Sequence, residues 1–135
     1  MQEVTIVIPN YNGKRLLENC LKTLEQQTYK DFKVLVVDNG SSDGSTEVSS
    51  EKLELEMVPL KENLGFCGAV NLGIQKTKTP YLILLNNDTE ADRHFVEKLL
   101  AGIKKSERIF SCGAQMIDFK NHEMLDNAGD LYTAM

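Results

Sequence analysis

The sequence predicts an α/β fold with a mostly parallel central sheet and helices on both faces. Short runs of apolar, often β-branched residues alternate along the chain with longer segments whose apolar residues recur at helical spacing. Turn-forming residues separate the two kinds of segment. This alternation is typical of parallel strands joined by crossover helices, and 135 residues are about the length of one domain.

Three apolar runs predict buried strands. They are VTIVIP at 4–9, FKVLVVD at 32–38 and YLILL at 81–85. Uninterrupted apolar runs of this length are typical of strands covered on both faces of a parallel sheet, and we expect 81–85 to be a central strand. Residues 53–59 alternate in polarity, which favours a strand with one wet face or at a sheet edge, and 109–118 predict another strand.

Helices are predicted between these strands. Residues 14–27 and 91–105 each carry an apolar stripe at helical spacing. Residues 63–77 read as a glycine-rich loop leading into a helix, and a short helix is expected near Ser45. Residues 119–135 predict loop with a short strand.

Composition and charge exclude several classes of protein. Apolar residues make up 41% of the chain and charged residues 26%, which is typical of a folded protein. The net charge of −5 argues against nucleic-acid binding. Three widely spaced cysteines without a CxxC motif argue against a disulfide framework or a zinc site. With no membrane-length apolar run or signal peptide, we expect a cytoplasmic protein; the full-length protein could associate with the inner face of a membrane.

Small polar residues follow each of the first four predicted strands. The segments are PNYNG at 9–13, DNGSSDGS at 38–45, ENLGFCGAVN at 62–71 and NNDTE at 86–90. In sheets of this kind ligands bind beyond the carboxyl ends of the strands. The four segments are therefore the candidate site, although turn and helix-cap roles are an alternative for each.

Known motifs narrow the kind of site. The chain lacks G-x-G-x-x-G after the first strand, the G-K-[ST] of a P-loop, the acidic pair of a receiver domain and the G-x-S-x-G of a hydrolase. His94 and His122 lie in unrelated contexts and are interpreted as surface residues. Among the kinds of site considered, a site for a sugar nucleotide is the one that these missing motifs do not exclude.

Three side chains have chemistry suited to such a ligand. Asp38 could accept hydrogen bonds from a base N–H or a ribose hydroxyl, and Tyr11 could stack on a base, which is worth ~1–3 kcal/mol in nucleic-acid complexes. Asp88 could bind Mg²⁺ or Mn²⁺, with substrate phosphates and waters completing the metal shell. On the residues alone, each could equally serve a turn, a cap or simple packing.

Four motifs together resemble a known family. TIVIPNYNG, VLVVDNGSSDGS, ENLGFCGAVNLGI and YLILLNNDTE occur in this order through nearly all of residues 4–90. In combination they resemble the family-two nucleotide-sugar glycosyltransferases, and the LLNND form is similar to their rhamnosyltransferase-like branch. The resemblance implies a Rossmann-like GT-A fold, present here as a truncated, donor-binding part.

The resemblance also implies roles for individual residues. Asp38 would hydrogen-bond a pyrimidine base, and Asp88 would be the ligand of a weakly bound, donor-dependent Mg²⁺ or Mn²⁺. Asn86 stands where the family often has a first aspartate and adds no charge, so low metal affinity is predicted. The other substrate-binding residues would be Pro9, Tyr11, Asn12, Asn63, Gly68, Asn71, Asn86 and Asn87.

The implied reaction is an inverting transfer in bacterial-type polysaccharide synthesis. A UDP- or dTDP-sugar would donate its sugar to a saccharide or lipid-linked acceptor. The resemblance places the catalytic base and the acceptor site beyond Met135, and Asp126 and Asp130 lie too early to match that base. Residues 1–135 are thus expected to be the donor-binding part, which alone would transfer sugar poorly or not at all.

Two other kinds of function stay open at this point. The chain could be a nucleotide-binding or interaction module without catalysis. It could also be a sugar nucleotidyltransferase, which normally carries a glycine- and arginine-rich loop with a lysine after its first strand. PNYNGKR, with one glycine and the adjacent Lys14 and Arg15, supports that reading only weakly.

Overall fold

The computed structural model describes residues 2–121 and 125–127. The described chain forms two compact units, which divide between Arg93 and His94. The first unit contains a parallel sheet with its helices. All four polar strand-end segments of the predicted site therefore belong to the first unit.

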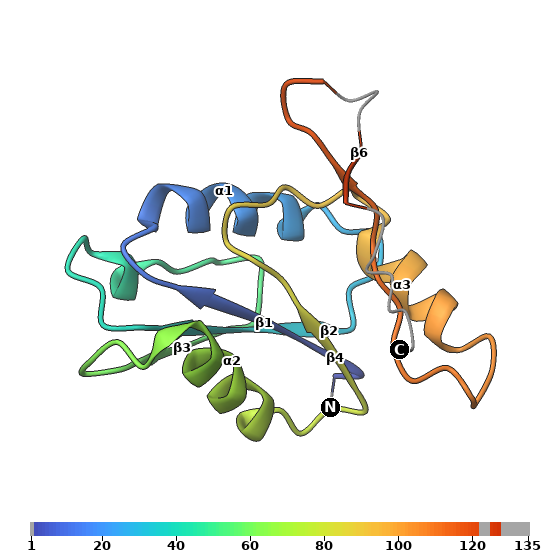
Figure 1. Ribbon diagram of the computed structural model, residues 1–135, viewed down its shortest axis with the longest axis horizontal. Coiled ribbons are helices and arrows are strands. Elements are labelled where there is room, and N and C mark those ends of the chain that lie inside the picture. Colours follow the sequence, from blue (N-terminus) through green and yellow to red (C-terminus); the bar gives the residue numbers. More distant parts are fainter. Residues whose placement is uncertain (1, 122–124, 128–135) are drawn as a thin grey trace, which may run out of the picture. The chain divides into compact units, whose positions relative to one another are not determined.

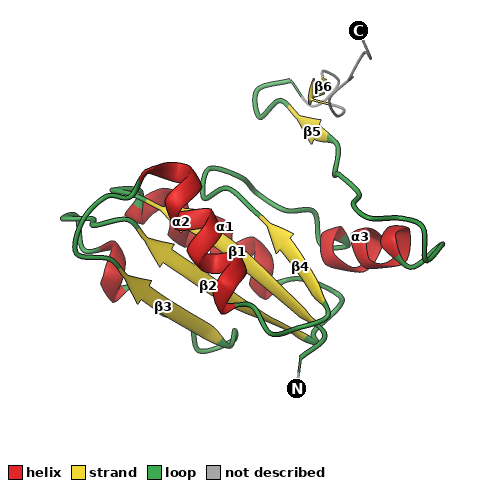
Figure 2. Ribbon diagram, turned by 60° about the horizontal axis from the view of Figure 1, so that its bottom comes forward, coloured by secondary structure: helices red, strands yellow, loops and turns green. Residues whose placement is uncertain are grey.

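The sheet has four parallel strands in the order β3-β2-β1-β4 (Figures 1 and 2). They are β1 (Val4–Asn10), β2 (Phe32–Asp38), β3 (Leu55–Pro59) and β4 (Tyr81–Leu84). The two middle strands are almost wholly buried, as their continuous apolar runs predict. The predicted parallel sheet is confirmed, and the alternating strand β3 lies at an edge as expected.

The prediction of a central strand at 81–85 is wrong. Among the described residues β4 pairs only with β1, at the edge of the sheet opposite β3. Residues 81–83 are half-buried, and the side chain of Leu84 is 52% exposed. An apolar run reports the hydrophobicity of a strand but not the number of its neighbours, so edge and centre look alike in sequence.

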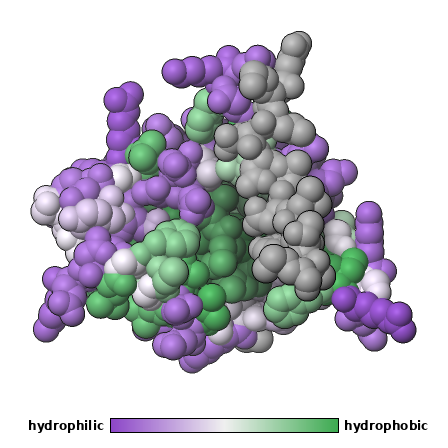
Figure 3. Space-filling model, in the orientation of Figure 1, coloured by the Kyte–Doolittle hydropathy of each residue, from purple (hydrophilic) through white to green (hydrophobic). Residues whose placement is uncertain are grey.

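Two helices cover opposite faces of this sheet, α1 (Lys14–Glu25) and α2 (Gly65–Lys76) (Figure 1). Helix α1 buries one stripe of side chains: Leu17, Cys20, Leu21 and Leu24. The short 3₁₀ helix η1 (Ser45–Glu47) follows β2 where a short helix was expected. On the face shown in Figure 3, hydrophobic residues gather centrally, and hydrophilic side chains project around them.

Helix α2 approaches the sheet very closely. Ala69 lies in a buried cluster with Val7, Leu35 and Val37 of the two middle strands. A Cβ atom added to Gly73 would lie 2.3 Å from Cγ1 of Val7, so only glycine fits between helix and strand at this point. This contact fixes α2, and with it the loop that precedes the helix at the carboxyl edge of the sheet.

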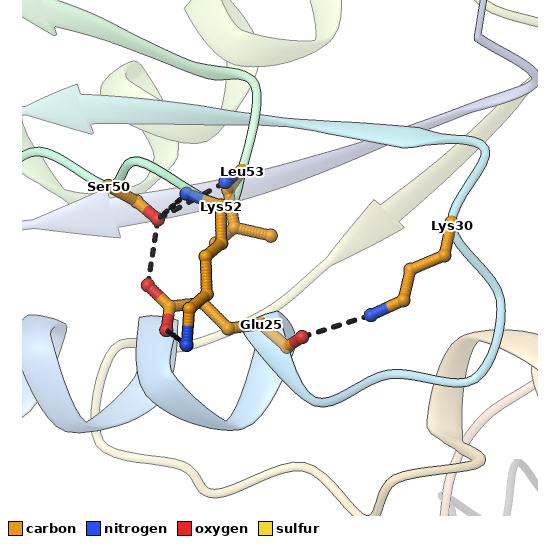
Figure 4. A network of polar contacts seen from close by, with 5 residues as sticks. All are labelled: Glu25, Lys30, Ser50, Lys52 and Leu53. Atoms are coloured by element: carbon orange, nitrogen blue, oxygen red, sulfur yellow. Dashed lines mark hydrogen bonds and ion pairs between the residues drawn. The ribbon is translucent and has the colours of Figure 1, made fainter.

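A polar network anchors the other end of α1 (Figure 4). The Glu25 carboxylate accepts a hydrogen bond from Ser50 Oγ at 2.7 Å and pairs with Lys52 Nζ at 3.9 Å. Lys30 Nζ donates to the Glu25 carbonyl oxygen at 3.0 Å. These contacts tie the C-terminus of α1 to the segment before β3, at the opposite end of the strands from the candidate site.

The second unit contains the helix α3 (Phe95–Ile103) and an antiparallel pair, β5 (Met116–Ile117) and β6 (Leu125–Asn127). The predicted helix at 91–105 and the short strand within 119–135 are confirmed. The strand predicted at 109–118 covers only two residues, because most of that run is exposed rather than packed. His122 and Asp130 lie outside the described residues.

Candidate functional site

An open pocket lies at the carboxyl ends of β1, β2 and β4, beside the start of α2. Its volume is about 350 Å³. The strand-end segments supply every lining residue: Pro9, Asn10, Tyr11, Asn39, Asn63, Phe66, Asn86, Asn87 and Asp88. The parallel topology thus brings four segments that are distant in sequence to one place.

Six of the ten residues predicted to bind substrate line this pocket. They are Pro9, Tyr11, Asn63, Asn86, Asn87 and Asp88. Tyr11 is 54% exposed, so its ring is accessible to a ligand, and the carboxylate of Asp88 is exposed as well. The lining therefore offers an aromatic surface together with amides and one carboxylate.

Asp38 lies beneath the pocket and is not part of its lining. Its side chain is fully buried, and its carboxylate accepts three hydrogen bonds. Oδ1 accepts from Asn10 Nδ2 at 2.9 Å and from Ser41 Oγ at 2.7 Å, and Oδ2 accepts from the Ser41 amide at 2.9 Å. Asn10 in turn accepts a hydrogen bond from Asn87 Nδ2 at 2.8 Å, which connects Asp38 to the pocket wall.

Asn12 joins two loops and does not line the pocket. It adopts a left-handed conformation, with φ of 47°. Its amide donates to Ser41 Oγ, and its Oδ1 accepts from the Ser42 amide, both at 2.8 Å. Next to it, the Lys14 amide at the start of α1 donates to Asp43 Oδ2 at 2.9 Å. The loops after β1 and β2 are thereby held together.

Gly68 and Asn71 belong to α2 and are also absent from the lining. The loop before that helix is held by Asn39, whose Oδ1 accepts from the Leu64 amide at 2.8 Å and whose Nδ2 donates to the Gly65 carbonyl at 3.0 Å. Asn39 therefore contributes to the pocket and also fixes the loop that carries Asn63.

The donor set around Asp88 fits a loosely held divalent cation. Magnesium and manganese favour oxygen ligands and are commonly bound by one or two carboxylates together with substrate phosphates. Asp88 supplies one exposed carboxylate, and the neighbouring Asn86 and Asn87 carry uncharged amides. Among the described residues no three acidic, histidine or cysteine side chains cluster as a metal cage.

Sequence reasoning missed three lining residues, Asn10, Asn39 and Phe66. Each lies within or directly beside a motif already selected, so proximity to those motifs was the available signal. The side chain of Phe66 is 61% exposed, although phenylalanine is among the residues most often buried. His94 is exposed beside Glu97, as expected of a surface residue.

Comparison with known families identifies the chain. The model of glycosyl transferase family 2 matches residues 5–124, which is most of the sequence. The chain belongs to glycosyl transferase family 2. The matched region includes all four strand-end motifs and every residue of the pocket.

Curated relatives of this family-2 chain are longer proteins. A glycosyltransferase of Rickettsia prowazekii is 30% identical over 90% of the chain, which corresponds to 39% of that relative. Glycosyltransferase GlyA of Streptococcus pneumoniae is 30% identical over 82% of the chain, and the teichoic acid poly(glycerol phosphate) polymerase of Staphylococcus epidermidis is 30% identical over 67%. The chain spans only 16% and 13% of the latter two.

Solved structures confirm the GT-A fold predicted for this family-2 chain. S. aureus TarS superimposes with a TM-score of 0.70 at 22% identity, over 78% of the chain and 33% of the TarS fragment 1–349. A mannosyltransferase from Pyrobaculum calidifontis, solved with GDP-Man and Mn²⁺, has a TM-score of 0.63 at 26% identity, over 67% of the chain and 29% of that protein. In the described part of the family-2 chain, no helix is long and apolar enough to cross a bilayer.

Proposed function

We propose that the chain is the donor-binding part of an inverting glycosyltransferase that uses a nucleoside-diphosphate sugar. The observation that carries this proposal is the convergence of the four family motifs on one open pocket. Support also comes from TarS, solved with UDP and with UDP-GlcNAc, and from the mannosyltransferase solved with GDP-Man and Mn²⁺. The acceptor, a saccharide or lipid-linked sugar, would bind to parts of the protein beyond residue 135.

The lining residues include groups suited to the base and ribose of such a donor and to its diphosphate. The exposed ring of Tyr11 provides a surface on which a base can stack. Asn63 and Asn39 place amides in the same lining, where they suit the polar edge of a base or a ribose. The carboxylate of Asp88 would lie toward the diphosphate.

Asp88, with the amides of Asn86 and Asn87 beside it, would hold Mg²⁺ or Mn²⁺ together with the diphosphate oxygens. When bound, the cation neutralises charge on the departing nucleoside diphosphate. Because a single carboxylate supplies all the negative charge that the protein contributes at this site, we expect weak metal binding without nucleotide and tighter binding with nucleotide. Phosphate oxygens then add the charge that the asparagines lack.

The finer assignments follow the resemblance. The LLNND form of the metal-side motif favours a rhamnosyltransferase-like enzyme, so dTDP- and UDP-sugars are the donors to test first. Synthesis of a bacterial-type polysaccharide would place the protein in the cytoplasm, with the full-length protein at the inner face of the membrane. Asp126 and Asp130 are not assigned as catalytic, and the base would come from beyond Met135.

A thermal-shift experiment tests donor binding directly. We expect UDP, dTDP or GDP to raise the melting temperature of the chain, and Mn²⁺ to increase that shift, because a ligand that binds only the folded state stabilises it. Asp88→Asn should lose the Mn²⁺-dependent part of the shift. Glu90→Gln, which removes an exposed carboxylate outside the pocket lining, is the matched control and should keep it.

Three results would contradict the proposal. No shift with any of the three diphosphates, with or without Mn²⁺, would leave an interaction module without nucleotide chemistry. A melting-temperature shift with nucleoside triphosphates equal to the shift with the diphosphates, and no larger shift with sugar nucleotides, would favour a nucleotidyltransferase. Efficient sugar transfer by the 135-residue chain alone would contradict the assignment as a donor-binding part.

A further inference from the structure

We propose that Asp38 orients the side-chain amides of Asn10 and Asn87, so that Asn87 presents its carbonyl oxygen to the pocket. Asp38 and Asn10 would then be positioning residues, and Asn87 would select the chemical group bound beside it. The consequence for binding rests on the proposed function, in which the pocket holds a nucleoside-diphosphate sugar. We call this chain of hydrogen bonds from Asp38 through Asn10 to Asn87 the amide relay.

The relay starts at a group that can only accept. The buried carboxylate of Asp38 already receives two hydrogen bonds from Ser41, one from its amide and one from its hydroxyl. A carboxylate offers no donor. The Asn10 amide, at 2.9 Å from Asp38 Oδ1, must therefore turn its NH₂ group toward Asp38.

The orientation of Asn10 then determines that of Asn87. Asn10 is 2% exposed, and its Oδ1 faces the Asn87 side chain at 2.8 Å. Two carbonyl oxygens at that distance would repel, so Asn87 must donate through Nδ2. Of the two polar atoms of the Asn87 amide, Oδ1 is the one outside this hydrogen bond, and none of the described residues donates a hydrogen bond to it.

Gly13 provides independent evidence that this link is tightly built. A Cβ atom at Gly13 would lie 2.5 Å from Asn87 Nδ2 and 3.0 Å from Asn10 Oδ1, so it would collide with the hydrogen bond between them. The φ of Gly13 is −119°, which any residue can adopt. A larger residue here would therefore displace the relay, because the relay occupies the space that its side chain needs.

The direction of the relay defines what the pocket accepts at Asn87. A carbonyl oxygen attracts an electropositive group, either the hydrogen of a ribose or sugar hydroxyl or a metal cation with its bound water. It repels phosphate oxygens and base carbonyls. The uncharged Asn87 thus discriminates between parts of a nucleotide. It does so because the buried Asp38 carboxylate, through Asn10, fixes which end of the Asn87 amide faces the pocket.

Exchanging the acid and the amide between the two ends tests the relay. In Asp38→Asn the Ser41 amide still requires an oxygen at the Oδ2 position, so the new NH₂ group faces Asn10. In Asn87→Asp the new carboxylate faces Asn10 Oδ1. Each single variant should lower the melting temperature by several degrees, whereas the double variant reverses both hydrogen bonds of the relay and should recover most of the summed loss.

The matched control for this cycle is Asn86→Asp. Asn86 is an exposed pocket residue next to Asn87 whose side chain is outside the relay. Combined with Asp38→Asn, it should give additive losses. Additive losses for the Asp38 and Asn87 pair as well, or a double variant that does not fold, would overturn the relay.

Ligand shifts on the same proteins test the polarity at the pocket. Asp38→Asn should turn the NH₂ group of Asn87 outward and reduce the melting-temperature shift given by UDP, dTDP or GDP. A reduction without metal identifies a hydroxyl at Asn87, and a reduction confined to added Mn²⁺ identifies the cation. Shifts equal to those of wild type in both conditions would overturn the proposal.

The two proposals fail in distinguishable ways. The stability cycle is measured without nucleotide, so it reports on the relay whether or not the pocket binds a sugar nucleotide. If wild type responds to no nucleotide but the cycle shows coupling, donor binding is wrong and the relay stands. If wild type responds and the cycle is additive, the relay is wrong and donor binding stands.

Discussion

Asparagine is the residue that characterises this pocket. Five asparagines contribute to its lining: Asn10, Asn39, Asn63, Asn86 and Asn87. An amide donates at one end and accepts at the other, so its useful direction depends on its neighbours. Asp38 supplies such a neighbour from a buried position, whereas Asp88 is the exposed acid of the lining. The lining thus carries one fixed charge, on Asp88, and its other polar side chains are amides and the Tyr11 hydroxyl.

At this scale we predict the effect of Gly13→Ala. The added methyl group would displace the Asn87 side chain, which can turn away into the open pocket. We therefore expect a stability loss of only about 1 kcal/mol, typical of a point substitution, but a large reduction in the nucleotide-dependent thermal shift. Gly113→Ala is the control, since no atom lies within 4 Å of its added Cβ. An unchanged nucleotide shift in Gly13→Ala would speak against the role of Asn87.

At the scale of elements, helix α1 depends on a neighbouring loop for its start. Gly13, at the N-cap position, has no side chain to cap the helix, and the Lys14 amide instead donates to Asp43. Asp43 also accepts hydrogen bonds from the hydroxyl and amide of Ser45, which begins η1. The Ser45 hydroxyl, followed by the Lys14 amide, lowers the pKa of Asp43 below its ordinary 3.8. One carboxylate thus organises two helix starts at the rim of the site.

We predict that Asp43→Ala destabilises the chain, as loss of an N-cap does. The measurement is the urea midpoint, and Asp43→Asn should lose less because its amide oxygen can still accept. Since the pKa is lower in the folded state, the stabilisation is present above pH 3.8 and is lost as the pH falls through the lowered value. The difference between wild type and Asp43→Ala should therefore vanish in strong acid, and a difference that grew in acid would contradict this.

At the scale of the whole molecule, the three cysteines report on how the chain folds. Cys20 is buried in α1 of the first unit, whereas Cys67 and Cys112 are exposed, one in each unit. Burial raises the pKa of the Cys20 thiol to about 11; Asp88 adds to this rise, and a hydrogen bond with Thr89 opposes it. At neutral pH this thiol is therefore protonated as well as inaccessible, and both properties make it unreactive.

We predict that an alkylating reagent at pH 8 labels Cys67 and Cys112 in the native protein and leaves Cys20 unlabelled. Mass spectrometry of proteolytic fragments would identify the sites. In increasing urea, labelling of Cys20 should begin only with unfolding of the first unit, since the thiol must leave the core to react. Labelling of native Cys20 as fast as Cys67 would show that α1 opens far more readily than its packing implies.

The sequence by itself determined the α/β class, the parallel strands and the location of the candidate pocket at the strand ends. These follow from local properties, namely the period of apolar residues and the turn residues between them. It also identified six lining residues, because residues at the end of a parallel strand or in the loop that follows it lie near that edge of the sheet. The edge position of β4 could not be predicted from the sequence, since an apolar run does not show how many neighbouring strands a strand has.

Only the tertiary structure decided how these residues act together. Asn10 meets Asp38 across 28 positions of sequence and Asn87 across 77, so no local pattern could show that a buried acid and a pocket amide share one partner. Asp38 was predicted to contact the ligand, and its place beneath the lining depends on which strands flank it. The sequence specifies each side chain, but the direction of a hydrogen bond depends on the partner that the folded structure places beside that side chain.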